Sequence, residues 1–298
     1  MARGQPFTLL CQQLSHAAMP RLCDLHIHTT HSDGLFEPAE VVRRALLAKV
    51  RAIAVTDHDS LSAHVHLVAA LQRSSAPTPL EIIPGVEITC EYQKRELHLL
   101  VYDPALDHAP LLAHLTELQE DRRARFLEMC QRVRQAGIHI DQSMITHWTQ
   151  QPANSLGRRH LAVYLVRSGQ VATVQQAFQR YLHEKHGHVP TKKRWAVGDA
   201  IAVARQAGGI TSWAHPSQDT TLAQVEELRE FGLHALEAEY PWPTNAHRKS
   251  IRQLAQQAGL AVSGGSDCHG PDPVKRMIGT CGIDIRELEI LRAMRTAS

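Results

Sequence analysis

The sequence has no long hydrophobic run, and nothing in it approaches the ~18 continuous apolar residues of a membrane-spanning helix. A short apolar patch at residues 7–10 is preceded by a single arginine and followed by Gln12 and Gln13, so it is too short and too polar for a signal peptide. We therefore expect a soluble, cytoplasmic protein with no membrane partner. Residues 1–20 are expected to be a disordered extension.

An excess of charge of one sign is also absent. Lys and Arg number 32 against 30 Asp and Glu, so no global positive field attracts nucleic acid, and any phosphate recognition must be local. Cysteines are few and lack the close pairing of a zinc ribbon, which predicts reduced thiols in the cytoplasm. The six are Cys11, Cys23, Cys90, Cys130, Cys268 and Cys281.

Histidines and acids are abundant at the ends of apolar runs, and residues 24–34 are the richest stretch. Side chains alternate along a strand, so His26 and His28 point to one face while Leu25 and Ile27 point to the other. Two imidazoles on one face can hold a divalent ion at ~2.0–2.1 Å. Asp33, beyond the following turn, adds an oxygen ligand for the same or a neighbouring ion.

Five more segments repeat this pattern of an apolar run with polar ligands. Each residue alone has an ordinary explanation, such as a hydrogen-bonded core histidine or a helix cap. Ionisable groups are rarely buried at strand ends unless they are paired or bind metal, so the joint pattern predicts a metal centre. The candidate ligands are His26, His28, Asp33, His58, Glu87, His98, His215, Asp267 and His269.

Strand-like and helix-like segments alternate along most of the chain, which predicts parallel βαβ units with about seven strands. The alternation breaks between residues 104 and 194. There an amphipathic helix spans residues 111–133, and shorter helical stretches follow near 142–149, 157–167 and 174–182. We therefore expect an α/β domain built from residues 21–103 and 195–298, with a helical insertion domain at 104–194 that forms a lid over the site.

Basic clusters mark the predicted insertion. The group Arg122, Arg123 and Arg125 is interpreted as a solvated helix face. Residues 154–160 and 192–194 are the better candidates for anion binding, because the first cluster lies at a helix start, where free backbone N–H groups favour an anion.

Taken together, residues 24–34, 56–59, 83–88 and 265–271 resemble the motifs of the PHP (polymerase and histidinol phosphatase) domain superfamily. The residues of these motifs are most similar to those of its TrpH-like branch. Members of that branch act as 3′,5′-nucleoside bisphosphate phosphatases and as 5′-to-3′ exoribonucleases of the RNase AM type. The resemblance spans roughly residues 21–284. It implies a distorted (β/α)7 TIM-like barrel with its ligands at the carboxyl ends of the strands.

The resemblance also implies up to three divalent metal ions, with Mn²⁺ preferred and Fe²⁺ or Zn²⁺ as alternatives. A hydroxide held between metals would attack phosphorus in line. His215, Asp267 and His269 are the implied catalytic residues, and we hypothesise that His215 protonates the departing oxygen. The implied ligand sets are His26, His28, Glu87 and Asp267 for the first ion, Asp33, His58 and His269 for the second, and Glu87, His98 and His215 for the third.

Substrate binding is implied for the insertion, where Gly157, Arg158 and His160 align with a Gly-Arg-Pro-His-like family motif. Arg159 stands where the family usually has a small residue or proline. The residues expected to grip the substrate's second phosphate are Asn154, Arg158, His160 and Lys192.

The implied substrates are nucleoside bisphosphates and the 5′ ends of short RNA, and no obligate protein partner is inferred. Two alternatives stay open. One is another phosphatase on the same scaffold, such as a histidinol phosphatase. The other is a non-catalytic binding module stabilised by metal.

Overall fold

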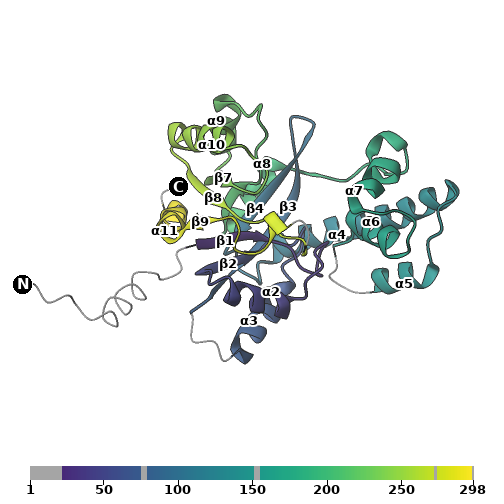
Figure 1. Cartoon of the computed structure of the whole chain (residues 1–298). Coiled ribbons are helices and arrows are strands. Elements are labelled where there is room, and N and C mark those ends of the chain that lie inside the picture. The colour runs from purple at the N-terminus through teal and green to yellow at the C-terminus, as the bar shows by residue number, and fades with distance from the viewer. Residues whose placement is uncertain (1–21, 75–78, 151–154, 272–273, 297–298) are drawn as a thin grey trace, which may run out of the picture.

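The computed structural model describes residues 22–74, 79–150, 155–271 and 274–296. The expectations for residues 1–20 and for Asn154 fall outside these ranges. A nine-stranded sheet forms the centre of the molecule, in the order β8-β7-β6-β4-β3-β2-β1-β9, with β5 paired to β3 (Figure 1). The strands are β1 (Leu22–Ile27), β2 (Ala52–Val55), β3 (Glu81–Tyr92), β4 (Arg95–Tyr102), β5 (Trp195–Ala196), β6 (Ile210–Trp213), β7 (Ala235–Glu239), β8 (Ala261–Gly264) and β9 (Ile283–Asp284).

The sheet closes almost completely on itself, which confirms the predicted TIM-like barrel. The end of β1 meets the segment after β8 in a parallel bridge between Ile27 and Cys268. Close approach here requires glycine, because a Cβ on Gly265 would lie 2.2 Å from the backbone nitrogen of His26. Closure therefore brings the ends of the first and the last long strands together.

Strand β4 departs from the expected parallel pattern, since it runs antiparallel to both β3 and β6. Only Gln93 and Lys94 separate β3 from β4, and a connection this short can join only antiparallel strands. The short strands β5 and β9 account for the difference from the expected seven.

Helices cover the outside of the barrel (Figure 1). Pro38 opens the first of them, as expected for its place in a first helical turn. The next begins at Ala63 with Ser62 at its N-cap. The barrel helices are α2 (Pro38–Leu47), α3 (Ala63–Arg73), α8 (Val197–Gln206), α9 (Leu222–Glu230), α10 (Asn245–Ala258) and α11 (Ile285–Ala293).

A second group of helices lies to one side of the barrel, between β4 and β5 in the chain (Figure 1). Its helices bury a hydrophobic cluster of their own around Phe126, Met129 and Leu161. We call this group the insert and keep its limits, 104 and 194, as a prediction. Within the described ranges, no helix has the length and apolar character needed to cross a bilayer. The insert holds α4 (Ala109–Gln135), α5 (Gln142–Gln150), α6 (Arg158–Arg167), α7 (Val174–Ala177), a π-helical segment (Phe178–Leu182) and a 3₁₀ turn (Glu184–His186).

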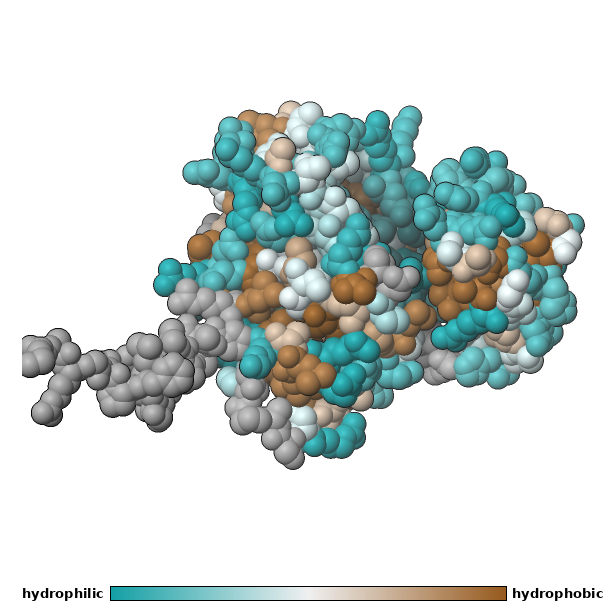
Figure 2. All heavy atoms as spheres, viewed as in Figure 1, coloured by the Kyte–Doolittle hydropathy of each residue, from teal (hydrophilic) through white to brown (hydrophobic). Residues whose placement is uncertain are grey.

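A buried ion pair fastens α4 to the barrel. Arg122, only 5% exposed, donates from Nε to Oδ2 of Asp59 at 2.5 Å and from Nη2 to the hydroxyl of Thr89 at 2.8 Å. Arg125 is also buried and donates to the Pro190 carbonyl oxygen. The interpretation of these arginines as a solvated face is therefore wrong, because Asp59 comes from a distant part of the chain. Figure 2 shows a recessed, hydrophilic surface between the barrel and the insert.

Candidate metal centre

The nine candidate ligands meet at one mouth of the barrel. Eight lie on or just after strands whose carboxyl ends open there, and His98 joins them from antiparallel β4, where it pairs with Thr89. Strand alternation places His26 and His28 on the same side, as expected. The nine side chains sort into three overlapping groups around Asp267, Asp33 and Glu87.

The first group consists of His26, His28 and Asp267. The Nε2 atoms of the two histidines are 3.2 Å apart, and they lie 3.6 Å and 3.4 Å from Oδ1 of Asp267. Ligand atoms that share an ion at ~2.0–2.1 Å in tetrahedral geometry stand roughly 3.3 Å apart. The spacing therefore fits one divalent ion.

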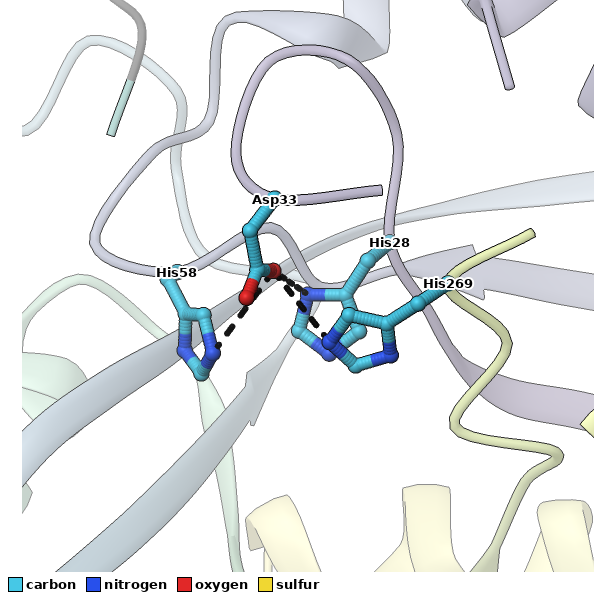
Figure 3. Close-up of side chains that lie close together, drawn as sticks. All are labelled: His28, Asp33, His58 and His269. Carbon is cyan, nitrogen blue, oxygen red and sulfur yellow. Dashed lines mark ion pairs between the residues drawn. The ribbon is translucent and has the colours of Figure 1, made fainter. Parts of the chain in front are cut away.

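The second group has Asp33 at its middle, as Figure 3 shows. Its Oδ1 lies 3.2 Å from Nε2 of His269, 3.9 Å from Nδ1 of His28 and 3.9 Å from Nε2 of His58. Among the described residues this buried oxygen has no hydrogen-bond partner. An unsatisfied buried carboxylate oxygen surrounded by imidazoles is what an ion-binding site requires.

Glu87 joins the groups. Its Oε2 lies 3.1 Å from Nδ1 of His58 and 3.2 Å from Nε2 of His28, while its Oε1 lies 2.8 Å from Nδ1 of His98 and 3.3 Å from Nε2 of His215. Both Nδ1 atoms, of His58 and of His98, are buried and make no hydrogen bond within the described chain. The carboxylate can therefore bridge neighbouring ions.

Burial alone would raise the pKa values of the three central acids, but the surrounding imidazoles reverse the effect. His58 and His98 hold the pKa of Glu87 well below its usual range. His269 and His58 act in the same way on the pKa of Asp33. The acids are thus ionised at neutral pH, the form in which they bind cations.

Backbone strain concentrates at the same place. His215 and Asp267 have φ values of 35° and 47°, and Asp59, beside His58, has φ 51°. Such left-handed conformations cost about 1–3 kcal/mol each for residues other than glycine, and they persist where the surroundings fix them. His215 is also the most accessible of the nine, with 32% of its side chain exposed, against 17% for His98.

Sequence reasoning missed two residues that support the ligands. Glu237, fully buried on β7, accepts a hydrogen bond from Nδ1 of His26 at 2.9 Å and another from the His215 backbone N–H at 2.7 Å. Arg276 contacts Oδ2 of Asp267 and lies 3.1 Å from Nδ1 of His269. An acid within an apolar strand was the available signal for Glu237, although Glu239 on the same strand gives the same signal.

Three of the residues expected to bind substrate, Arg158, His160 and Lys192, fall within the described ranges and belong to the insert. Nζ of Lys192 lies 3.0 Å from Oε1 of Glu96, and the same oxygen lies 3.0 Å from Nε2 of His98. Glu96 therefore links Lys192 to a candidate ligand. Arg158 lies 3.6 Å from Glu184. Nδ1 of His160 accepts from the Gly157 backbone N–H, which occupies that nitrogen locally.

A cluster of cations lies in the insert. Burial, together with Arg158 and Arg122, lowers the pKa of Arg125 to about 10. Burial and Arg122 lower the pKa of Lys192 to about 8, against the opposing effect of Glu96. Like charges held together out of water favour an anion between them.

An oxygen- and nitrogen-lined cluster of this kind, at the mouth of a TIM-like barrel, defines a divalent metal-binding protein of the α/β-barrel class. The PHP domain family matches residues 24–186 of the chain. The chain belongs to the PHP domain family, as the sequence motifs predicted.

Relatives with assigned activities match almost the whole chain. The 5′-3′ exoribonuclease Rnm of Salmonella typhimurium is 33% identical over 84% of this chain and 86% of its own length. The 3′,5′-nucleoside bisphosphate phosphatase of Chromobacterium violaceum is 31% identical over 86% and 90%, respectively. A solved structure from Bifidobacterium adolescentis, thought to be a metal-dependent phosphoesterase, shares the fold with a TM-score of 0.82 at 23% identity, covering 91% of this chain and 96% of that one.

Proposed function

We propose that the chain is a metal-dependent phosphoesterase that removes the 3′-phosphate of nucleoside 3′,5′-bisphosphates and shortens RNA from its 5′ end. The observation that carries this proposal is the convergence of nine imidazole and carboxylate side chains on one mouth of the barrel. The activities of the two named relatives support the substrate class.

Both reactions break the same bond. The bond between phosphorus and O3′ of the first nucleotide is cleaved, a water oxygen bonds to phosphorus, and a proton from that water ends on O3′. Divalent ions, when bound, lower the pKa of water and neutralise phosphate oxygens. Imidazole and carboxylate ligands without thiolate fit Mn²⁺ first, and Fe²⁺ or Zn²⁺ as alternatives.

The chain's own side chains provide the rest. Glu237 orients His26 and fixes the backbone at His215. His215, the most accessible of the nine, is placed to deliver the proton to O3′. Arg158 and Lys192, within the cation cluster, bind the 5′-phosphate, where a guanidinium fork matches the oxygens of the phosphate.

A cytoplasmic location belongs to the same proposal. The five cysteines within the described ranges are buried and form no disulfide with one another, which fits a reducing compartment.

A turnover screen that detects both inorganic phosphate and released 5′-mononucleotides tests the proposed function. The purified holoprotein is given adenosine 3′,5′-bisphosphate, adenosine 5′-monophosphate, histidinol phosphate and a short 5′-phosphorylated RNA. We expect turnover of the bisphosphate and the RNA and little of the others. Turnover of histidinol phosphate instead would identify the other phosphatase class, and turnover of none would leave a binding module. Arg158→Ala should reduce the preference for bisphosphate over monophosphate, with Arg180→Ala, an exposed arginine of the insert, as its control.

A further inference from the structure

A cavity of about 310 Å³ opens between the loop that carries Asp33 and helices α5 and α6 of the insert. Asp33 itself forms part of its wall, so the cavity is continuous with the second ligand group. Ligand pockets in proteins begin at roughly this size, and a single nucleotide is a ligand of the matching class. On the insert side the wall consists of His147, Trp148, Arg159, His160, Val163 and Arg167.

The chemistry of the cavity suits a nucleotide. Trp148 is partly exposed, and its ring meets His160 and Tyr164 edge-on rather than stacking on them. Arg167 is exposed and pairs with no acid in the described part of the chain. Val163 adds an apolar surface, and Glu37 on the opposite wall offers an acceptor. Aromatic rings bind bases by stacking, and arginines bind the phosphates between them.

Arg159 is the strongest indication that the cavity binds an anion. Its Nε is buried and has no hydrogen-bond partner among the described residues, and no ion pair compensates for its charge there. It also lies near enough to Arg276 to lower the pKa of that partly buried guanidinium, after burial itself and against the effect of Asp267. Arg159, which lines the cavity together with Asp33, and Arg276, which pairs with Asp267, therefore favour an anion here.

The cavity and Lys192 approach the centre through different ligands. Lys192 contacts Glu96, and Glu96 contacts the candidate ligand His98. Arg276 contacts the candidate ligand His269, and the candidate ligand Asp33 forms part of the cavity wall. A substrate whose 5′-phosphate binds at Lys192 and whose scissile phosphate binds at the centre would therefore continue toward Arg159.

We propose that this cavity binds the nucleotide that follows the scissile phosphate, with Trp148 stacking on its base and Arg159 binding the next phosphate, on the 3′ side of that nucleotide. The inference rests on the proposed function and deepens it, because it makes an RNA chain, rather than a mononucleotide alone, the substrate for which the site is built. A bisphosphate leaves the cavity empty.

The test compares two substrates that share the first nucleotide and the bond broken: adenosine 3′,5′-bisphosphate and the 5′-phosphorylated trinucleotide pApApA, which carries a phosphate on the 3′ side of its second nucleotide. Base stacking on an aromatic side chain corresponds to about 5- to 150-fold in binding. We expect Arg159→Ala and Trp148→Leu each to lower kcat/KM for pApApA within this range and to leave the bisphosphate within about twofold. Arg180→Ala is the matched control and should change neither.

Among the described residues Nε of Arg159 has no hydrogen-bond partner to lose, so Arg159→Ala is expected to fold even if Trp148→Leu does not. Equal losses on both substrates, or no loss on pApApA, would overturn the inference. A wild-type protein that hydrolyses the bisphosphate but not pApApA would overturn it as well and leave the bisphosphate part of the proposed function standing. A wild type that hydrolyses neither would remove both.

Discussion

Glu237→Gln should weaken metal binding without unfolding the protein. The carboxylate accepts two hydrogen bonds, from Nδ1 of His26 at 2.9 Å and from the His215 backbone at 2.7 Å. A glutamine has one acceptor oxygen and no charge, so it can replace only one of them. A hydrogen bond to a charged group contributes about 1.5–3 kcal/mol. Loss of a carboxylate that orients a ligating histidine lowers metal affinity about 10- to 100-fold, or ~1.4–2.7 kcal/mol, so the two magnitudes agree.

Isothermal titration of metal-free protein with Mn²⁺ measures this effect directly. Glu239→Gln is the matched control, because Glu239 lies on the same strand but pairs with Arg252 at 2.9 Å, away from the ligands. We expect Glu237→Gln to bind Mn²⁺ 10- to 100-fold more weakly and Glu239→Gln to stay within about twofold. Unchanged affinity in the first variant, or the same loss in both, would refute the role given to Glu237.

Three further outcomes are expected. Arg122→Met strands the buried Asp59 carboxylate and should cost about 3–5 kcal/mol in urea unfolding, and a smaller loss after adding Asp59→Asn would identify the charge as the cause. Burial first and then Arg205 lower the pKa of His234 from 6.5 to about 4. The contribution of neutral His234 to the free energy of unfolding is therefore complete above pH 6.5 and is lost as the pH falls toward 4. At ~1.4 kcal/mol per pH unit this is roughly 3 kcal/mol, and a His234→Asn protein whose stability shows the same pH dependence as wild type would contradict it. His215→Gln should slow hydrolysis of the bisphosphate about 10²- to 10⁴-fold but spare a nitrophenyl phosphate ester, whose leaving group needs no proton; equal slowing would argue against proton donation.

Local patterns in the sequence predict the alternating strands and helices and the positions of the candidate ligands along the chain, whereas closure into a barrel was implied by the resemblance to the PHP domain. Each ligand lies at a fixed offset from an apolar run, and alternation along a strand determines which face His26 and His28 share. The carboxyl ends of strands in a barrel then bring distant segments together. No long-range contact has to be known for this step.

The supporting residues depend on tertiary contacts that no local pattern contains. Glu237 and Glu239 both interrupt an apolar strand, and only the packed barrel shows that the first meets His26 while the second meets Arg252. Arg122 belongs to a charge run typical of a solvated helix face, and its burial depends on Asp59, which lies 63 residues earlier.

The metal content of the purified protein, measured together with its activity, tests most directly whether the clustered histidines and acids perform the chemistry. We predict that a chelator removes divalent metal and activity in proportion, and that added Mn²⁺ restores hydrolysis of adenosine 3′,5′-bisphosphate. Full hydrolysis by protein from which all divalent metal has been removed would contradict a metal-dependent mechanism.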